Sequence, residues 1–180
     1  MSHVVALAGN PNVGKSTLFN ALTGLNQHVG NWPGKTVERA EGTFKFRGEL
    51  VHVVDLPGTY SLQASSLEEV VAQDFIMSGQ PDVVIVLADA TNLERNIYFV
   101  LQTLELTDRV VVALNMVDVA EATGLKIDVE RLSQSLGVPV VPISAAKGKG
   151  VEELLDIAIA VANGYIKPEP VVSYGEEIEK

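Results

Sequence analysis

Short apolar runs alternate along the chain with segments in which apolar residues recur at helical spacing. The apolar runs are typical of buried strands, and their alternation with helices predicts an α/β fold with a largely parallel sheet. The expected strands are residues 4–8, 43–46, 50–54, 83–89, 110–114 and 138–143. The expected helices are residues 15–23, 67–78, 93–106, one or two pieces within 119–136, and 151–162. We therefore expect three layers: a mostly parallel six-stranded sheet with one antiparallel edge strand, and helices on both faces.

Local signals set the ends of several of these elements. Residues 43–46 and 50–54 flank a short polar turn and predict an antiparallel hairpin. Ser66 precedes Glu69 at the spacing of a capping box, so a helix should begin there. Residues 25–39 show no periodicity and contain a Pro-Gly pair, which predicts a loop. That loop is long enough to indicate a functional role.

Composition and charge narrow the class of protein. The 180 residues fit one domain with a tail, and the formal net charge of −10 argues against a broad nucleic-acid surface, which needs clustered Lys and Arg. The absence of cysteine excludes disulfides and agrees with a reducing compartment. The three histidines lack zinc-ligand spacing. No signal peptide is visible, and every apolar run is shorter than the about 20 residues of a membrane helix. We expect this stretch of chain to be soluble.

The segment Gly9-Asn-Pro-Asn-Val-Gly-Lys-Ser16 matches the phosphate-binding pattern G-x-x-x-x-G-K-[ST]. A predicted strand leads into it and a predicted helix leads out, which is the context that this loop requires. Backbone N–H groups and the helix N-terminus attract phosphate oxygens. Lys15 would reach the β- and γ-phosphates, and the Ser16 hydroxyl would hold Mg²⁺. The loop therefore predicts nucleotide binding.

Two further segments point to guanine as the base. Asn115 and Asp118 match N-x-x-D directly after the predicted strand 110–114. With this motif the sequence resembles the translation-factor-related GTPases, in which the aspartate accepts two hydrogen bonds from guanine N1 and N2 and the asparagine supports the loop. Adenine cannot supply these donors. Ser144-Ala145 resembles the loop whose backbone contacts the guanine oxygen.

The same resemblance implies a magnesium site with two mobile loops. Asp55 and Gly58 match D-x-x-G, where the aspartate holds Mg²⁺ through water and the glycine N–H meets the γ-phosphate. Thr36 is the only threonine in the loop of residues 25–39, so it is the candidate for the second hydroxyl ligand of the metal. Ser16, Thr36 and Asp55 form the expected Mg²⁺ set.

Activation of hydrolysis is less obvious from the sequence. Thr59 stands where many signalling GTPases carry glutamine, and no arginine lies in the phosphate loop or next to Asp55, although Arg39 stays a candidate. Because an arginine finger accelerates hydrolysis about 10³–10⁵-fold, the intrinsic rate should be low. Asn12 resembles the asparagine by which potassium-activated GTPases hold K⁺, with the carbonyls of residues 30–32 completing that site. The alternative is an asparagine that stabilises its own turn.

The resulting hypothesis assigns a role to each of these residues. The expected catalytic residues are Lys15, Thr36, Gly58 and Asn12. The expected GTP/GDP contacts are Gly9, Asn10, Asn12, Val13, Gly14, Lys15, Ser16, Thr17, Thr36, Asp55, Gly58, Asn115, Met116, Asp118, Ser144, Ala145 and Ala146. The expected metal ligands are Ser16, Thr36 and Asp55 for Mg²⁺, and Asn12 for K⁺.

Three longer segments resemble FeoB, the prokaryotic ferrous-iron transport proteins that carry an N-terminal G domain. They are Asn31-Trp-Pro-Gly-Lys-Thr-Val-Glu38, Asp55-Leu-Pro-Gly-Thr-Tyr-Ser61 and Asp89-Ala-Thr-Asn-Leu-Glu-Arg-Asn96. Within the first, Lys35 departs from the small aliphatic residue expected there. The resemblance covers residues 4–164, and it implies a GTP-hydrolysing switch on the cytoplasmic face of the cell membrane.

The same resemblance divides the chain. It implies that residues 1–165 are the G domain, and that residues 166–180 are a linker and the truncated start of a helical domain that leads to a membrane domain. The expected partners are a guanine nucleotide and these later domains of the same protein, and no nucleic acid. Two alternatives stay open. One is a soluble GTPase of ribosome or RNA maturation, and the other is a nucleotide-binding module with negligible turnover.

Overall fold

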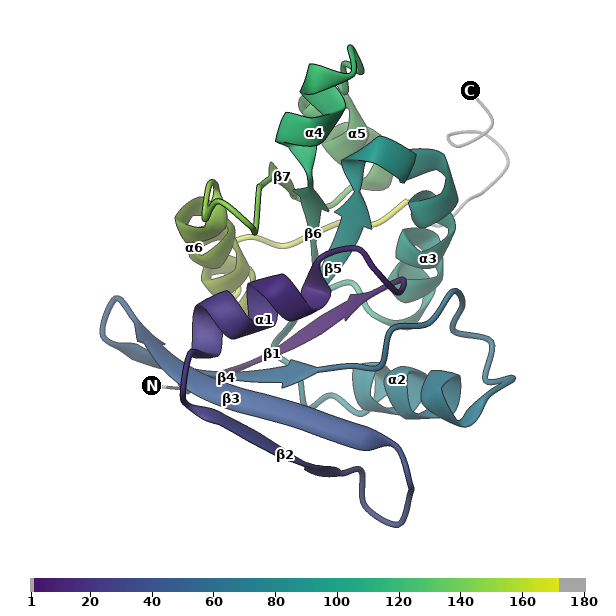
Figure 1. Ribbon diagram of the computed structural model, residues 1–180, viewed down its shortest axis with the longest axis vertical. Coiled ribbons are helices and arrows are strands. Elements are labelled where there is room, and N and C mark those ends of the chain that lie inside the picture. The colour runs from purple at the N-terminus through teal and green to yellow at the C-terminus, as the bar shows by residue number, and fades with distance from the viewer. Residues whose placement is uncertain (1, 172–180) are drawn as a thin grey trace.

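The computed structural model describes residues 2–171, which fold into a seven-stranded sheet with helices on both faces (Figure 1). The strands are β1 (Ser2–Gly9), β2 (Gln27–Asn31), β3 (Glu38–Phe46), β4 (Glu49–Asp55), β5 (Val83–Asp89), β6 (Val110–Asn115) and β7 (Val140–Pro142). The helices are α1 (Lys15–Thr23), α2 (Leu67–Met77), α3 (Leu93–Leu106), α4 (Val117–Ala122), α5 (Val129–Leu136) and α6 (Val151–Ala162). A short 3₁₀ turn, η1 (Ala90–Asn92), precedes α3.

The sheet confirms the predicted fold class and corrects the number of strands. Its order is β2-β3-β4-β1-β5-β6-β7, and β3 runs antiparallel to both β2 and β4. We expected six strands, but Gln27–Asn31 forms a seventh inside the segment predicted to be a loop. All five residues of β2 are exposed, so no apolar pattern marks them. Their strand conformation comes from backbone pairing with β3, which therefore lies inside the sheet rather than at its edge.

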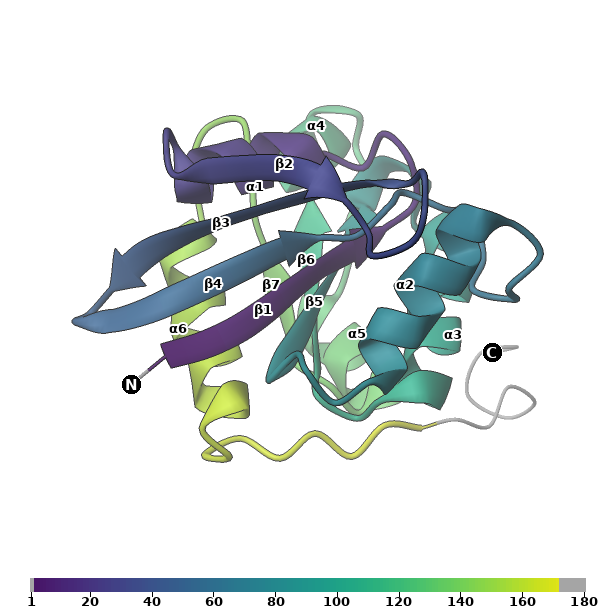
Figure 2. The same cartoon turned by 90° about the horizontal axis from the view of Figure 1, so that it is seen from below.

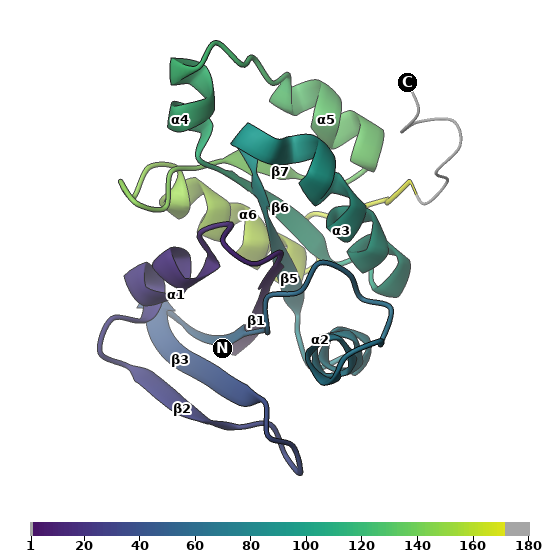
Figure 3. The same cartoon turned by 45° about the vertical axis from the view of Figure 1, so that its right-hand side comes forward.

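The apolar strands are buried because helices cover both faces of the sheet. Figures 2 and 3 show α1 and α6 on one side and α2 and α3 on the other. Alternate residues of β1 divide between the two cores: Leu7 belongs to the cluster beneath α1 and α6, and Ala8 to the cluster beneath α2 and α3. Strands β5 and β6 are apolar almost throughout, as expected for parallel strands buried on both faces.

Turn and cap chemistry agree with the sequence patterns. Arg47 and Gly48 join β3 to β4 with φ of 49° and 81°, the two left-handed positions that a tight hairpin turn needs. The predicted hairpin is confirmed, although β3 starts earlier than expected. Ser66 Oγ accepts a hydrogen bond from the Glu69 N–H at 3.1 Å, so the predicted cap of α2 is also confirmed.

The end of the described chain returns to the base of the molecule. After α6 it crosses beneath the sheet (Figure 2), and the Glu169 and Val171 N–H groups donate to the Gly137 and Leu136 carbonyls. A Cβ at Gly137 would lie 2.0 Å from the Glu169 carbonyl oxygen, so the crossing depends on that glycine. The predicted start of a helical domain falls largely in residues 172–180, outside the described residues. Within residues 2–171, no helix has the length and apolar character needed to span a membrane.

Candidate functional site

The candidate site lies where several strands end at one edge of the sheet. The phosphate loop connects β1 to α1, the segment containing Gly58 follows β4, Asn115 ends β6, and Ser144 follows β7. These four strands run parallel, so the segments that follow them meet at the same edge. This is the usual location of ligand sites in open α/β sheets.

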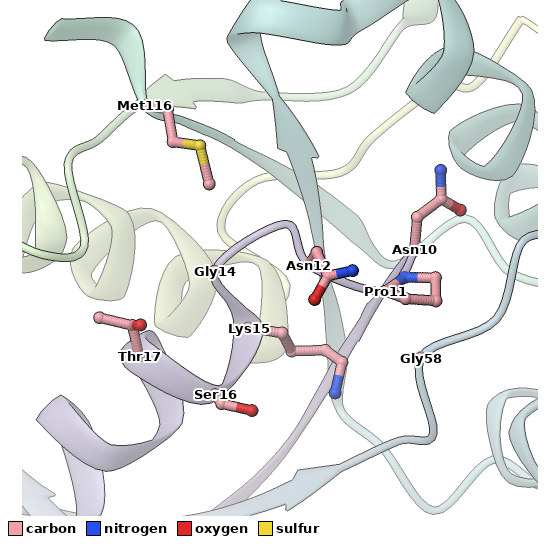
Figure 4. A pocket seen from close by; sticks show the side chains of 9 residues that line it. All are labelled: Asn10, Pro11, Asn12, Gly14, Lys15, Ser16, Thr17, Gly58 and Met116. Carbon is pink, nitrogen blue, oxygen red and sulfur yellow. The ribbon is translucent and has the colours of Figure 1, made fainter. Parts of the chain in front are cut away.

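A cavity of about 540 Å³ opens over the phosphate loop. Its lining residues are Asn10, Pro11, Asn12, Gly14, Lys15, Ser16, Thr17, Gly58 and Met116 (Figure 4). Eight of these nine were predicted nucleotide contacts; Pro11, inside the motif, was not. The Lys15 and Ser16 side chains point to one side of the loop, whereas Asn10 points to the other (Figure 4). The loop thus presents an ammonium group and a hydroxyl to the same space.

Glycine is required at the tightest point of the loop. Gly14 has φ of 92°, and a Cβ there would lie 2.2 Å from Asn115 Nδ2. Asn115 lies this close because its side chain bonds to the phosphate loop and to the loop after β7. Its Nδ2 donates to the Val13 carbonyl at 2.9 Å, and its Oδ1 accepts from the Ala145 N–H at 3.0 Å. One buried amide therefore ties the phosphate loop to the loop after β7. This is the supporting role that the motif predicted.

Lys15 and Asp55 neutralise each other in this structure. Lys15 Nζ lies 2.5 Å from Asp55 Oδ1, and the two side chains are only 11% and 16% exposed. Burial raises the pKa of Asp55, and the ammonium of Lys15 opposes that rise. Both residues were predicted to serve a bound nucleotide, through its phosphates and its metal.

Asp118 is partly exposed in the first turn of α4, two residues after Met116, which lines the cavity. Its Oδ2 lies 3.0 Å from Lys147 Nζ and 3.5 Å from Ser144 Oγ. The hydrogen bond from Lys147 holds the pKa of Asp118 below its usual range, so the carboxylate stays an acceptor. Ala146, next in the same loop, is exposed. The contact with Lys147 was not predicted; a lysine two residues after Ala145 was the available signal.

The first of the two loops expected to be mobile, residues 25–39, which we call the first switch segment, does not line the cavity. Thr36 is exposed in the turn between β2 and β3 and does not line the cavity. Gly30 pairs with Arg39 in the β2–β3 ladder, and the Trp32 carbonyl accepts from the Lys35 N–H at 2.9 Å. The structure thus brings Lys15, Ser16 and Asp55 to one edge, but neither Thr36 nor the carbonyls of residues 30–32.

The second loop expected to be mobile, residues 56–66 after β4, which we call the second switch segment, is held by hydrogen bonds to the phosphate loop, to itself and to α2. Thr59 is buried, its N–H meets the Gly9 carbonyl at 3.4 Å, and its hydroxyl donates to the Ser61 carbonyl at 2.8 Å. The Glu69 carboxylate accepts from Ser61 Oγ at 2.6 Å, which is the main cause of its lowered pKa. The Thr59 hydroxyl is engaged within its own loop.

The donors near the cavity suit magnesium by their chemistry. Ser16 offers a hydroxyl and Asp55 a carboxylate, and oxygen donors of this kind are the ligands that Mg²⁺ takes beside phosphates. Within residues 2–171, no group of three or more His, Cys, Asp or Glu is placed to hold a metal ion. A metal at this edge would depend on the Asp55 carboxylate, the Ser16 hydroxyl and phosphate oxygens together.

Comparison with known proteins bears directly on the family. The family model described as ferrous iron transport protein B matches residues 3–158. The chain belongs to the FeoB family. It is 53% identical over 154 residues to the Fe(2+) transporter FeoB of Salmonella typhimurium and 51% identical over 154 residues to that of Escherichia coli K12. Each alignment covers 83% of this chain and 20% of the relative, so the chain spans about a fifth of those FeoB proteins.

Solved FeoB structures have the same fold. The G domain of T. maritima FeoB is 46% identical with a TM-score of 0.84, over 90% of this chain and 99% of that chain. The cytosolic domain of T. maritima FeoB in its GMPPNP form is 46% identical with a TM-score of 0.90, over 98% of this chain and 70% of that chain. This chain is therefore a FeoB G domain with the P-loop GTPase fold, which confirms the predicted recognition. The alternative of a ribosome-maturation GTPase is not supported.

Proposed function

We propose that this chain is the GTP-binding and GTP-hydrolysing switch domain of a ferrous-iron membrane transporter. The observation that carries the proposal is the link made by Asn115, which joins the phosphate loop to the base-reading loops through Val13 and Ala145. Cytosolic domains of T. maritima FeoB have been solved in GDP and GMPPNP forms, which supports a guanine nucleotide as the ligand. Iron passage would belong to the rest of the polypeptide, since this chain covers about a fifth of its relatives.

The proposal assigns the predicted contacts to parts of the nucleotide. Residues 9–17 would hold the phosphates, Asp118 would read the guanine edge, and residues 144–146 would lie against the base. Residues 1–165 would be the G domain and residues 166–180 the connection to later domains. We place the module on the cytoplasmic face of the membrane, where GTP is available. The proposed partners of this G domain are a guanine nucleotide and the later domains of the same polypeptide.

Magnesium fits the proposal through Ser16, Asp55 and, after a movement of the first switch, Thr36. When bound, Mg²⁺ neutralises charge on the β- and γ-phosphates. The residues of the chain do the remaining work: Lys15 exchanges Asp55 for phosphate oxygens, and the Gly58 N–H faces the γ-phosphate. Gly58 is suited to this because a Cβ there would already lie 3.3 Å from Pro11 Cα.

Guanine selectivity tests the proposal as a whole. Because adenine offers Asp118 no pair of donors, GDP should bind about a hundredfold tighter than ADP, a ratio that one or two charge-assisted hydrogen bonds supply. Isothermal titration calorimetry of the purified chain with GDP and ADP in Mg²⁺ measures both affinities. Equal affinities would refute the guanine assignment, and no binding of either would refute the nucleotide site.

Potassium is proposed as the activating cation, held in part by Asn12. Asn12 lines the cavity with φ of 66°, and within the described residues its amide makes no hydrogen bond to protein. An amide without a protein partner favours an available ligand over an amide that stabilises its own turn. The charge of K⁺ beside the phosphates would do part of the work of the absent arginine finger.

Hydrolysis should therefore be faster in K⁺ than in Na⁺ at equal ionic strength, by about tenfold or more. Phosphate release from GTP under single-turnover conditions measures the rate. Asn12→Ala should abolish the difference between the salts, whereas Asn20→Ala, an exposed asparagine on α1, should keep it. Equal rates in both salts for the parent chain would rule out the potassium role. An absence of turnover in either salt would instead favour the nucleotide-binding module.

A further inference from the structure

The only tryptophan of the sequence packs against α2, the helix that follows the second switch segment. Trp32 lies in the turn between β2 and β3 and is 7% exposed. Its ring meets the ring of Phe75 on α2 edge-on, with centroids 5.3 Å apart and an interplanar angle of 67°. Such edge-to-face pairs contribute beyond simple burial. Figure 2 shows the turn lying beside α2.

Arg39 closes the other side of this contact. Its guanidinium carbon lies 4.4 Å from the Trp32 ring centroid and 5.6 Å from that of Phe75, and its Nε donates to Glu41 Oε2 at 2.7 Å. The guanidinium is thereby engaged by both aromatic rings and a carboxylate. With these contacts Arg39 does not line the cavity over the phosphate loop, where an arginine finger would act. We name Trp32, Phe75 and Arg39 the tryptophan latch.

The latch fixes the turn that carries Thr36. The Trp32 N–H donates to the Val37 carbonyl at 2.9 Å, and Val37 is 8% exposed in the same apolar cluster as Trp32. Both ends of the turn are therefore anchored, and Thr36 between them points its exposed side chain to solvent rather than to the cavity. While Trp32 and Val37 stay buried, Thr36 between them is held in this exposed position.

The docked state also carries a built-in cost. Within the described residues, Trp32 Nε1 is buried and has no hydrogen-bond partner. A buried N–H without an acceptor loses its hydrogen bonds to water and gains none in return. The aromatic contacts hold the ring down, and the unpaired N–H opposes them. A ligand that makes its contacts only when the ring has left this site can therefore stabilise the released ring.

We propose that Trp32 is a positioning residue whose docking on Phe75 and Arg39 holds the first switch away from the phosphates. This inference rests on the proposed function, because the interaction that would stabilise the released state is the contact of Thr36 with a γ-phosphate and its metal. A ligand that needs the undocked state binds with an affinity reduced by the fraction of chains in that state. GTP therefore competes with the latch, whereas GDP, which lacks the γ-phosphate, does not.

The single tryptophan provides a direct readout. Emission of the purified chain should shift to longer wavelength when GMPPNP and Mg²⁺ bind, because the ring leaves its apolar site, and should stay unchanged with GDP and Mg²⁺. Binding of both nucleotides is verified by calorimetry in the same buffer. Unchanged emission with bound GMPPNP would overturn the latch. Failure of both nucleotides to bind would overturn the proposed function, and the latch with it.

Phe75→Ala separates the latch from general destabilisation. This variant should improve binding of GMPPNP relative to GDP about threefold to tenfold, the scale of one lost edge-to-face pair, and should shift the emission without nucleotide. Ile76→Ala truncates the neighbouring buried side chain of the same helix, leaves both rings in place, and should keep the parent ratio. Phe75→Leu keeps the apolar volume and gives the same test if the alanine variant folds poorly. A parent-like GMPPNP/GDP ratio in both Phe75 variants would contradict the proposal.

Discussion

Replacement of Asp118 by asparagine is expected to lower the affinity for GDP about thousandfold, since two charge-assisted hydrogen bonds of roughly 1.5–3 kcal/mol each are lost. The carboxylate accepts hydrogen bonds from both guanine N1–H and N2–H. The asparagine amide can accept only one of them, because its NH₂ group faces the other guanine donor. The variant should instead prefer XDP, because xanthine carries a carbonyl where guanine carries its amine. Calorimetric titration with GDP, XDP and ADP measures the change of preference.

Asp128→Asn provides the matched control for this change. Asp128 caps α5 by accepting from the Arg131 N–H, and asparagine caps helices about equally well. The control should keep the parent affinities and the parent thermal stability. Asp118→Asn should also fold normally, because its ion pair with Lys147 is exposed and such pairs contribute little. A GDP affinity within threefold of the parent would show that Asp118 does not read the base.

The elements predicted most accurately are those whose ends and periodicity are both local. Strand β5 and helices α1, α3 and α6 begin and end at the predicted residues, because apolar runs or helical spacing are bounded there by glycine, proline or capping residues. The phosphate loop belongs to this class, since its motif and its flanking elements lie within a few residues of one another. For these segments the sequence alone carries enough information.

The parts that were missed depend on distant partners. Strand β2 has five exposed residues, and only its pairing with β3 makes it a strand. The sequence predicts Trp32 only as a loop residue, because its packing partner Phe75 is distant in the chain. Thr36 lies in the same turn as Trp32 and does not line the cavity, so the packing of that turn separates residues that the motifs group together. A sequence motif identifies the residue types that contact a ligand, but tertiary packing determines whether those residues lie at the site in a given structure.

The supporting contacts of the motif residues fall between these cases. The N-x-x-D pattern predicted that Asn115 supports a loop, and the structure identifies the partners as Val13 and Ala145. The sequence gap of 102 residues between Val13 and Asn115 hides this bond from any local pattern. The pairing of Asp118 with Lys147 is likewise visible only once β6 and β7 lie side by side.

Lys15→Ala is the second change with a large expected effect, and it acts on two properties at once. Loss of the charged contacts to two phosphates should lower the affinity for GDP and GTP about thousandfold. Without nucleotide, the variant should also lose about 2 kcal/mol of folding free energy, because it leaves the Asp55 carboxylate largely buried with no cation beside it. Calorimetry measures the first effect, and denaturant unfolding measures the second. Lys149→Ala, which removes an exposed lysine, should change neither.

The double variant Lys15→Ala/Asp55→Asn separates the two effects. Asp55 and Lys15 neutralise each other at 2.5 Å, so removal of the second charge relieves the cost of the first, and folding stability should return close to that of the parent. Nucleotide affinity should not return, because neither the phosphate contact nor the carboxylate for Mg²⁺ is restored. Recovery of both properties would mean that Lys15 acts only by neutralising Asp55. Recovery of stability alone is the expected result. The single variant Asp55→Asn then shows how much of the lost affinity belongs to the carboxylate, and the remaining loss assigns Lys15 a direct contact with the nucleotide.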